Sequence, residues 1–387
     1  MVKIINIDDP HVDSTSVGGW DQKAGMHSNW VEAQKRLGEC VDAANDIKAD
    51  FFVVGGDLFD NGKPTAEAVG LTKDNFERLH PDCTLILLDG NHDQQTVVSD
   101  HRTPIAAYFG GLKNVVAVSR SCIVDVDGMQ FASVPWLRVA GKTKVENASD
   151  ELKRVVESLG NKIKPGPSMF AAHMVVDECT FDNGMARGSE MSMATSLLEA
   201  HIPTALIDEG PWSIARLGHI HKRQQLSDKT GYGGSIYKVS FGEHKEAKGY
   251  DIIEIDDKNN AVLEFGKLDV RELIKLDLSA RGNSDVADIE TVNEGDIVRI
   301  VVDYDDFDSL DVKNVEAKLD KMGISHHIER LSKPRREIVS RVNSVPVDAS
   351  PLDGLNLYMS KYGIEDEDER NELLAELNRI MSIVGTK

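Results

Sequence analysis

The fold of this chain is decided by a ten-residue stretch, FFVVGGDLFD, at positions 51–60. Four apolar residues lead directly into Gly55-Gly56-Asp57, which is the pattern of a short buried strand that ends in a turn. A carboxylate in such a turn lies at the carboxyl end of a strand. In layered α/β folds, ligand sites form at this edge of the sheet because loops from neighbouring strands converge there on a rigid scaffold. The stretch therefore predicts an α/β fold with Asp57 at a functional edge.

Four other apolar runs lead into polar residues in the same way. The runs are Lys3–Ile7, Leu85–Leu88, Met169–Ala172 and Ile214–Leu217, and the polar groups after them are Asp9-Pro10-His11, Gly90-Asn91-His92-Asp93, His173 and Gly218-His219-Ile220-His221. Each group would lie at a strand end, so five segments far apart in the sequence can meet at one point. If His219 and His221 continued their strand, alternation would place both imidazoles on one face.

Each polar group also has an ordinary structural explanation when it is taken alone. Asp9, His11 and Asp57 suit turns or caps, and His173 after two alanines suits a core histidine with satisfied hydrogen bonds. A shared site is favoured because all five groups occur at strand ends and in one order.

The residue types in these groups are those of a site for two divalent cations. Imidazole nitrogens, carboxylates and an Asn carbonyl suit Mn, Zn or Fe rather than a soft-metal thiolate site. Asp57 has two carboxylate oxygens and could bridge cations about 3.5 to 4 Å apart, the spacing of two-metal phosphoryl-transfer sites. Such a pair would bind a phosphate oxygen, generate a hydroxide nucleophile and stabilise transition-state charge. His92 would then be available for acid catalysis.

The order Asp-x-His, Gly-Asp-Leu-Phe-Asp, Gly-Asn-His-Asp, a lone His and Gly-His-x-His resembles that of the calcineurin-like metallophosphoesterases. It most resembles their SbcD branch, the bacterial and phage counterpart of the eukaryotic double-strand-break repair nuclease. Further landmarks of that branch are Val134-Pro135-Trp136-Leu137-Arg138, Gly233-Gly234-Ser235, Phe241-Gly242-Glu243 and Lys248-Gly249. The resemblance covers about residues 1–256 and extends to the remainder only in layout. It implies a four-layer α/β/β/α sandwich with a small α+β capping domain and a C-terminal helical segment.

The same resemblance implies the roles of the site residues. One metal would be held by Asp9, His11 and His221, and the second by Asn91, His173 and His219, with Asp57 bridging both. His92 would stand near the leaving oxygen as proton donor or charge stabiliser, assisted by Asp93. Some family members carry His where this chain has Asp60, so the role of Asp60 in catalysis or DNA placement stays open.

The length of 387 residues predicts two or three domains. We expect a nuclease domain at 1–268, an α+β DNA-capping domain at 269–345 and a helical segment at 346–387. In the first, residues 30–47 have a helical period and 256–260 form a tight turn. In the second, the sequence predicts strands over 297–303 and 325–331 and a helix over 312–322. That this domain positions DNA is an expectation from the family alone.

The C-terminal segment carries two apolar stripes at helical spacing. They are Leu352, Leu355, Tyr358 or Met359 and Tyr362 in the first, and Leu373, Leu377, Ile380 and Val384 in the second. The stripes either pack on the core of the chain or, as the resemblance implies, dock to the coiled coil of an SbcC-type ATPase. The sequence contains no Gly-x-x-x-x-Gly-Lys-Ser/Thr phosphate loop, so ATP hydrolysis would come from that partner.

The formal net charge of −21 is the opposite of the basic footprint of a nucleic-acid binder. Two divalent cations would reverse the sign locally. Basic groups occur at Arg138–Lys144, Lys222-Arg223 and Lys333–Arg341, although each could equally be a solvated face. We therefore expect weak DNA binding by this chain alone, and a protein partner or a homodimer that adds positive surface.

The four cysteines, Cys40, Cys83, Cys122 and Cys179, are scattered without paired spacing. This is typical of a reduced compartment in which buried cysteines act as small apolar residues. No apolar stretch approaches the roughly 20 residues needed to cross a bilayer, and the first residues lack a signal-peptide pattern. The sequence predicts a cytoplasmic protein of a bacterium or a phage-infected host, with no membrane partner.

Together these observations predict a manganese-dependent nuclease subunit of an SbcCD-like DNA repair or recombination complex. By resemblance it would act as an exonuclease on double-stranded ends and as an endonuclease on single strands or hairpins. One alternative is a phosphatase or small phosphodiesterase with the same dinuclear site, which the acidic composition favours. The other is a non-catalytic architectural subunit that clamps DNA, which the complete ligand set disfavours.

Overall fold

The computed structural model describes residues 1–94, 104–109, 112–137, 145–180, 200–279, 289–290, 292–303 and 310–331, and single positions between 352 and 377. The chain forms two compact units, Met1–Arg330 and Leu331–Lys387. The boundaries predicted near residues 268 and 345 are not tested by this division and stay predictions. In the second unit, the described positions Leu352, Leu355, Met359, Leu373 and Leu377 are helical, and the remaining residues of the two predicted stripes lie outside the described residues.

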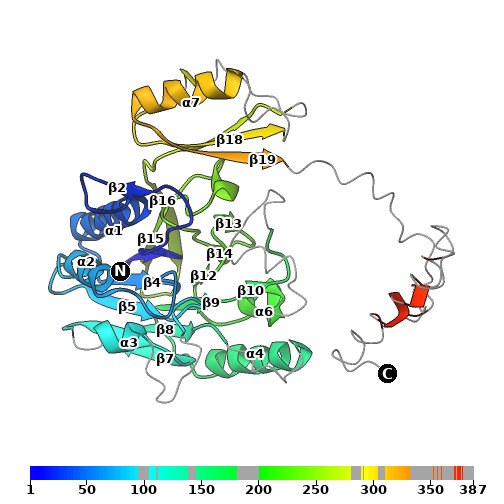
Figure 1. Ribbon diagram of the computed structural model, residues 1–387. Helices are drawn as coiled ribbons and strands as arrows, with labels where there is room; N and C mark the ends of the chain where they lie inside the picture. The colour runs from blue at the N-terminus through cyan, green and yellow to red at the C-terminus, as the bar shows by residue number, and fades with distance from the viewer. Residues whose placement is uncertain are drawn as a thin grey trace. The chain divides into compact units, whose positions relative to one another are not determined.

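Two six-stranded sheets form the centre of the first unit (Figure 1). The first has the order β16 (Ala261–Lys267), β15 (Gly249–Ile255), β1 (Val2–Ile7), β4 (Phe51–Val54), β5 (Thr84–Leu88), β6 (Val115–Val118). The second has the order β13 (Gln224–Gln225), β14 (Thr230–Tyr232), β12 (Ile214–Gly218), β9 (Ser168–His173), β8 (Met129–Val134), β7 (Cys122–Val126). In each sheet four consecutive strands run parallel, β1-β4-β5-β6 and β14-β12-β9-β8. The parallel strands of each sheet therefore present their carboxyl ends at one edge.

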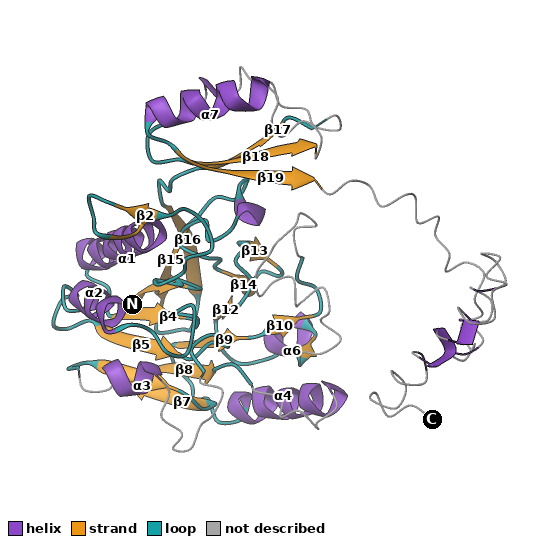
Figure 2. Cartoon of the chain, viewed as in Figure 1, coloured by secondary structure: helices purple, strands orange, loops and turns teal. Residues whose placement is uncertain are grey.

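Helices cover the outer face of each sheet (Figure 2). The helices are α1 (Ser28–Ile47), α2 (Ala66–Phe76) and α3 (Pro104–Phe109) on the first sheet, and α4 (Val145–Gly160) and α6 (Thr204–Asp208) on the second. Two short strand pairs, β2 (Trp20–Asp21) with β3 (Met26–His27) and β10 (Val175–Val176) with β11 (His201–Ile202), lie outside the large sheets. This arrangement is the predicted four-layer α/β/β/α sandwich.

Strand β4 shows why residues 51–54 are all apolar and do not alternate between apolar and polar residues. Phe51 and Val53 point into the core between the two sheets, whereas Phe52 and Val54 point into the core under the helices. A strand of a sheet that is covered on both faces is buried at every position, and its sequence is continuously apolar. The predicted strand at 51–54 is confirmed, and the other four predicted runs begin or end within one residue of the observed strands.

A smaller sheet with its own core follows the sandwich in the sequence. It consists of β17 (Leu273–Asp277), β18 (Ile297–Asp303) and β19 (Ser325–Leu331), with helix α7 (Leu310–Met322). The apolar face of α7, with Val312, Val315 and Leu319, shares a buried cluster with Val298 and Ile300 of β18. The predicted small α+β fold is therefore confirmed, including both predicted strands.

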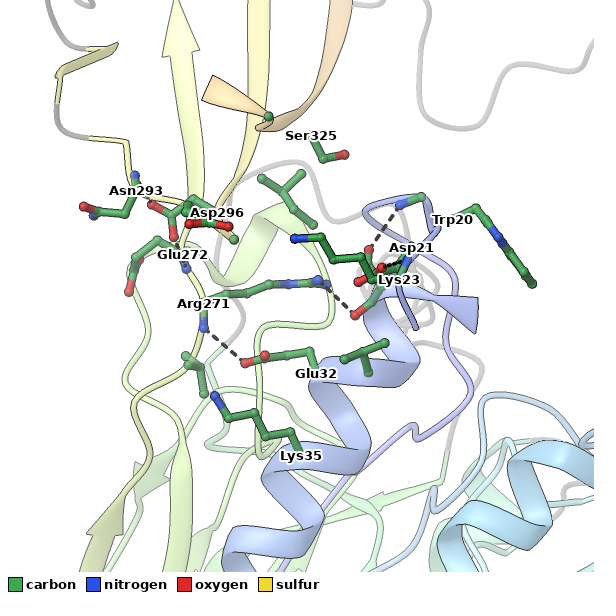
Figure 3. Close-up of a pocket in the computed structure, with 18 of the residues that line it drawn as sticks. Trp20, Asp21, Lys23, Glu32, Lys35, Arg271, Glu272, Asn293, Asp296 and Ser325 are labelled. Atoms are coloured by element: carbon green, nitrogen blue, oxygen red, sulfur yellow. Dashed lines mark hydrogen bonds between the residues drawn. The ribbon is translucent and has the colours of Figure 1, made fainter. Parts of the chain in front are cut away.

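The small sheet contacts the sandwich near the start of α1. Val17 packs against Leu273 and Ile297, and Arg271 Nη1 donates to the carbonyl of Ser28 at 3.1 Å (Figure 3). A cavity of about 780 Å³ lies between these segments. None of the predicted metal ligands lines it, so this cavity is separate from the candidate site.

All four cysteines are free thiols, but they differ in burial. Cys40 and Cys83 are buried, Cys179 is partly buried, and Cys122 is exposed at the start of β7. The prediction that the cysteines are buried is wrong for Cys122, because β7 is an edge strand with one side toward solvent. Among the described residues, no helix has the length and apolar character needed to cross a membrane.

We expect Phe131→Ala to lower the free energy of unfolding by about 3 to 5 kcal/mol, because it empties the core between the sheets. The Phe131 ring is fully buried and its centroid lies 5.0 Å from that of Phe51. Urea unfolding followed by fluorescence measures the change. The control Val262→Ala removes methyl groups from a side chain that is 58% exposed, and it should change stability by less than about 0.5 kcal/mol. Equal losses in both variants would contradict the layered core.

Candidate metal centre

Strand ends from both large sheets meet at the candidate site. Asp9, Asp57 and Asn91 lie two or three residues beyond the ends of β1, β4 and β5 in the first sheet. His173 is the last residue of β9, and His219 directly follows β12 in the second sheet. The site therefore lies where the carboxyl edges of two sheets adjoin, as the strand-end pattern of the sequence predicts.

Among the described residues, three groups of side chains each bring their possible ligand atoms within 4.8 Å of one another. They are Asp9, His11 and His221; Asp57, His173 and His219; and His11, Asp60 and His92. The first two groups correspond to the two halves expected from the sequence. Asn91 joins the second, since its Oδ1 lies 3.0 Å from His173 Nε2 and 2.9 Å from His219 Nδ1.

Asp57 lies between the two halves. Its Oδ1 accepts a hydrogen bond from the backbone amide of His92 at 2.8 Å. Its Oδ2 lies 3.6 Å from His11 Nε2 and 3.4 Å from His173 Nε2. One carboxylate oxygen is thus anchored by the backbone, while the other faces both halves, as a bridging ligand requires.

The hydrogen-bond partners direct ring nitrogens and side-chain oxygens toward one another at the centre. His173 Nδ1 lies 2.9 Å from the carbonyl of Gly55, which can only accept, so this nitrogen carries the proton. Its Nε2 then faces the oxygens of Asn91 and Asp57. In the other half, His11 Nε2 and His221 Nε2 face each other at 3.1 Å. Such a convergence of acceptor atoms needs a positive charge between them. Imidazole, carboxylate and amide groups are ligands that fit divalent cations.

Electrostatic coupling between buried groups supports the same conclusion. Burial alone would lower the pKa of His173, but the charge of Asp57 raises that pKa to about 9. Burial alone would raise the pKa of Asp57, yet His173, His92 and His11 hold it well below its ordinary value. The carboxylate of Asp57 therefore stays ionised in a buried site that attracts cations.

Left-handed backbone conformations concentrate at this centre. Among the described residues, eight non-glycine residues have positive φ, and four of them are Asp9, His11, Asp57 and His219, with φ of 48°, 37°, 50° and 97°. Such conformations are strained for residues with a side chain and cluster at functional sites. The strand-end turns therefore hold their side chains at a conformational cost.

The expectation that His219 and His221 alternate along a strand is wrong. Strand β12 ends at Gly218, and the positive φ of His219 turns the chain out of the sheet. The two imidazoles then separate, since His219 Nδ1 meets Asn91 and His221 Nε2 meets His11. Their division between two halves, implied by the family resemblance, fits this geometry.

His92 and Asp93 take different positions. His92 Nδ1 lies 2.8 Å from the carbonyl of Asp60, and its ring packs edge-on against His11 with centroids 4.9 Å apart. The Asp93 carboxylate accepts hydrogen bonds from the backbone amides of Leu58, Phe59 and Gly90. Burial and the charge of Asp57 raise the pKa of Asp93 to about 7. Asp93 thus fixes the loops that carry Asp57 and His92.

Two residues beside the centre have partners that the sequence did not predict. The Trp136 ring packs against His219 with centroids 4.6 Å apart, and Glu243 Oε1 lies 3.1 Å from His221 Nδ1. Trp136 follows the end of β8 by two residues, so the strand-end pattern could have indicated it. Glu243 lies in no strand-end motif, and only its place among the family landmarks marked it.

The basic groups predicted to help DNA binding are only partly described. Arg223 is engaged inside the fold, because it forms an ion pair with Asp251 and stacks 4.2 Å above the Phe265 ring. Its guanidinium therefore has a structural function. The groups at 138–144 and 333–341 lie outside the described residues.

We expect Gly56→Ala to weaken metal binding at least about tenfold, because it displaces His173, a predicted ligand. Gly56 has φ of 107°, and a Cβ there would lie 2.2 Å from His173 Nδ1. Titration of the metal-free protein with MnCl2 measures the affinity. The control Gly70→Ala adds a methyl group in α2 with nothing within 4 Å and should leave metal binding unchanged. Unaltered affinity in Gly56→Ala would exclude His173 as a ligand.

The chain is similar to several known proteins. A sequence 22% identical over 244 residues is the D subunit of the nuclease SbcCD of Staphylococcus epidermidis, and the alignment covers 59% of this chain and 61% of that protein. The chain thus spans less than two thirds of this curated relative. Solved structures similar to the chain include TT1561 of Thermus thermophilus, with TM-score 0.36, 14% identity and coverage of 69% and 98% of the two chains. Another is a dimetal phosphatase from Danio rerio, with TM-score 0.37, 10% identity and coverage of 68% and 98%.

The family match is the decisive comparison. The calcineurin-like phosphoesterase family matches residues 3–223, which is more than half of the chain. This range contains both large sheets up to β12 and every predicted metal ligand. The chain belongs to the calcineurin-like phosphoesterase family.

Proposed function

We propose that the chain is a manganese-dependent DNA nuclease subunit that cleaves phosphodiesters at a centre of two divalent cations. The observation that carries the proposal is the position of Asp57 between two groups of ligand atoms from five strand ends. The similarity to one subunit of the nuclease SbcCD supports DNA as the substrate. Exonuclease action on double-stranded ends and endonuclease action on single strands or hairpins are parts of this proposal.

The protein supplies the geometry of the reaction. When bound, the two cations would polarise the phosphoryl oxygen, activate water and neutralise developing negative charge. Asp9, His11 and His221 would hold one of them, and Asn91, His173 and His219 the other. Asp57 would contact both, because one of its oxygens already faces both halves. The Asp93 carboxylate accepts hydrogen bonds from the backbone amides of Leu58, Phe59 and Gly90, which keeps the loops after β4 and β5 in place.

His92 is the proposed general acid. Its Nδ1 lies against the carbonyl oxygen of Asp60, which only accepts, so Nδ1 carries a proton. Protonation of Nε2 then gives an imidazolium that can donate to the leaving oxygen. Asp93 would assist this step by positioning His92, because its carboxylate binds backbone amides of the neighbouring loops.

Net charge and domain layout suggest how the chain works in the cell. With a formal charge of −21, binding to DNA by the chain alone would be weak and salt-sensitive. We propose that an SbcC-type ATPase docks on the C-terminal helical segment and adds positive surface. We also propose that two copies of this chain form a homodimer. The assembly would act in the cytoplasm in DNA repair or recombination. The small sheet with α7 would position DNA over the metal centre.

Purified protein should degrade an end-labelled linear DNA duplex when Mn2+ is added, and Asp57→Asn should abolish this degradation. The substitution keeps the size of the side chain but removes the charge that faces both halves. The experiment follows the release of label with time in wild type and variant. Degradation that persists in Asp57→Asn would contradict the proposed centre.

His92→Ser separates acid catalysis from metal binding. The backbone amide of residue 92, which anchors Asp57 Oδ1, is retained, so we expect two bound Mn2+ per chain. Cleavage should fall by about 10² to 10⁴-fold, the usual contribution of general acid-base catalysis. Metal analysis and single-turnover cleavage give the two values. Loss of a cation in His92→Ser would show that His92 is a ligand, in the group with His11 and Asp60.

A phosphatase or small phosphodiesterase with the same site is the second candidate, and the strongly acidic composition favours it. A chromogenic phosphodiester with long duplex DNA as competitor distinguishes the two. Inhibition by DNA supports the nuclease, whereas unchanged turnover supports the small substrate. A non-catalytic DNA clamp would bind fewer than two cations and cleave neither substrate.

A further inference from the structure

Glu243 touches the candidate centre without belonging to the predicted ligand set. Its Oε1 lies 3.1 Å from His221 Nδ1, and its side chain is only 2% exposed. It ends the single-turn helix η2 (Phe241–Glu243), whose capping box with Ser240 fixes the turn locally. The sequence marks this segment as a family landmark but gives it no function.

Glu243 is held in place by several groups. Its Oε2 accepts from Ser235 Oγ at 3.0 Å and from the Val239 amide at 3.2 Å. Lys248 Nζ lies 2.6 Å from the same oxygen. Three donors, one of them an ammonium group, thus hold an ionised carboxylate in a fixed orientation.

Helix η2 is also fixed from the side of the small sheet. Phe241 packs against the cluster of Val17, Leu273 and Ile297, and the Arg299 guanidinium lies 4.2 Å above its ring. A guanidinium group over an aromatic face stabilises this contact. The position of Glu243 thus depends on packing at both ends of a three-residue helix.

This carboxylate determines how His221 faces the centre. An ionised carboxylate can only accept, so Nδ1 of His221 carries the proton and donates to Glu243. The electron pair on Nε2 is then directed toward His11 Nε2, 3.1 Å away. A partner on the far nitrogen of a ligating imidazole fixes its tautomer and orientation and increases its basicity.

Two other ligand histidines, His173 and His11, have weaker partners on their Nδ1 atoms. His173 Nδ1 meets the neutral carbonyl of Gly55. His11 Nδ1 lies 3.3 Å from Asp60 Oδ1, but the Asp60 side chain is 38% exposed, so water can replace its carboxylate. Glu243 is buried, so water cannot readily take the place of its carboxylate, and its removal is correspondingly costly.

We propose that Glu243 is a positioning residue, which fixes the tautomer and orientation of His221 for a divalent cation shared with Asp9 and His11. This inference rests on the proposed metal centre and extends it to a residue outside the ligand set. It predicts that one of two metal-binding events depends on Glu243 and the other does not.

The test compares Glu243→Gln with Glu246→Gln by calorimetric titration of metal-free protein with MnCl2 at constant pH. Glu243→Gln keeps the side-chain volume but removes the charge, and we expect about 10 to 100-fold weaker binding of one Mn2+, with the other unchanged. Glu246 also forms an ion pair with Lys248, at 2.7 Å. The control therefore removes a carboxylate partner of Lys248 without changing the contact between Glu243 and His221. It should bind both cations like wild type.

Thermal unfolding of the metal-free variants shows whether folding is affected. If Glu243→Gln unfolds at a lower temperature, the double variant Glu243→Gln/Lys248→Met removes both buried charges and is titrated in its place. Wild-type affinity in the Glu243 variants would overturn the inference, and so would an equal loss in Glu246→Gln. A wild-type protein that binds no Mn2+ would instead contradict the metal centre itself, so the two failures are distinguishable.

Discussion

The buried negative charge of Asp57 is the constraint on which the rest of the site depends. Its side chain is 2% exposed, and an ionised carboxylate in such surroundings costs several kcal/mol unless other groups compensate. The compensating groups come from both sheets, because His11 follows β1 and His173 ends β9. The two sheets must therefore adjoin at this edge with their turns in fixed positions, and the sandwich of three apolar cores provides that rigidity.

A second network of buried polar side chains supports the same edge of the two sheets. Arg216 Nε donates to Asp251 Oδ2 at 2.7 Å, which joins β12 to β15 and so links the two sheets. Asp8 Oδ2 accepts from Asn6 and from the Gly233 amide. Burial raises the pKa of Asp8 well above its ordinary value. The ligand turns that follow β1 and β12 are thus supported by polar contacts that belong to the fold.

Much of the fold and of the candidate site could be predicted from the sequence. Parallel strands that are covered on both faces are continuous apolar runs, so their ends can be located to within one residue. The turn at His219 could not, since a positive φ outside glycine leaves no periodic signal. The partnership of Glu243 with His221 joins residues that are 22 positions apart, and no spacing rule relates them. Exposure of Cys122 depends on which strand forms the edge, which is a property of the assembled sheet.

The most direct test of the dinuclear centre is anomalous diffraction from crystals soaked in Mn2+. The account predicts two peaks about 3.5 to 4 Å apart, one beside Asp9, His11 and His221 and the other beside Asn91, His173 and His219, with Asp57 in contact with both. A single peak among His11, Asp60 and His92, or no peak near Asp57, would contradict it.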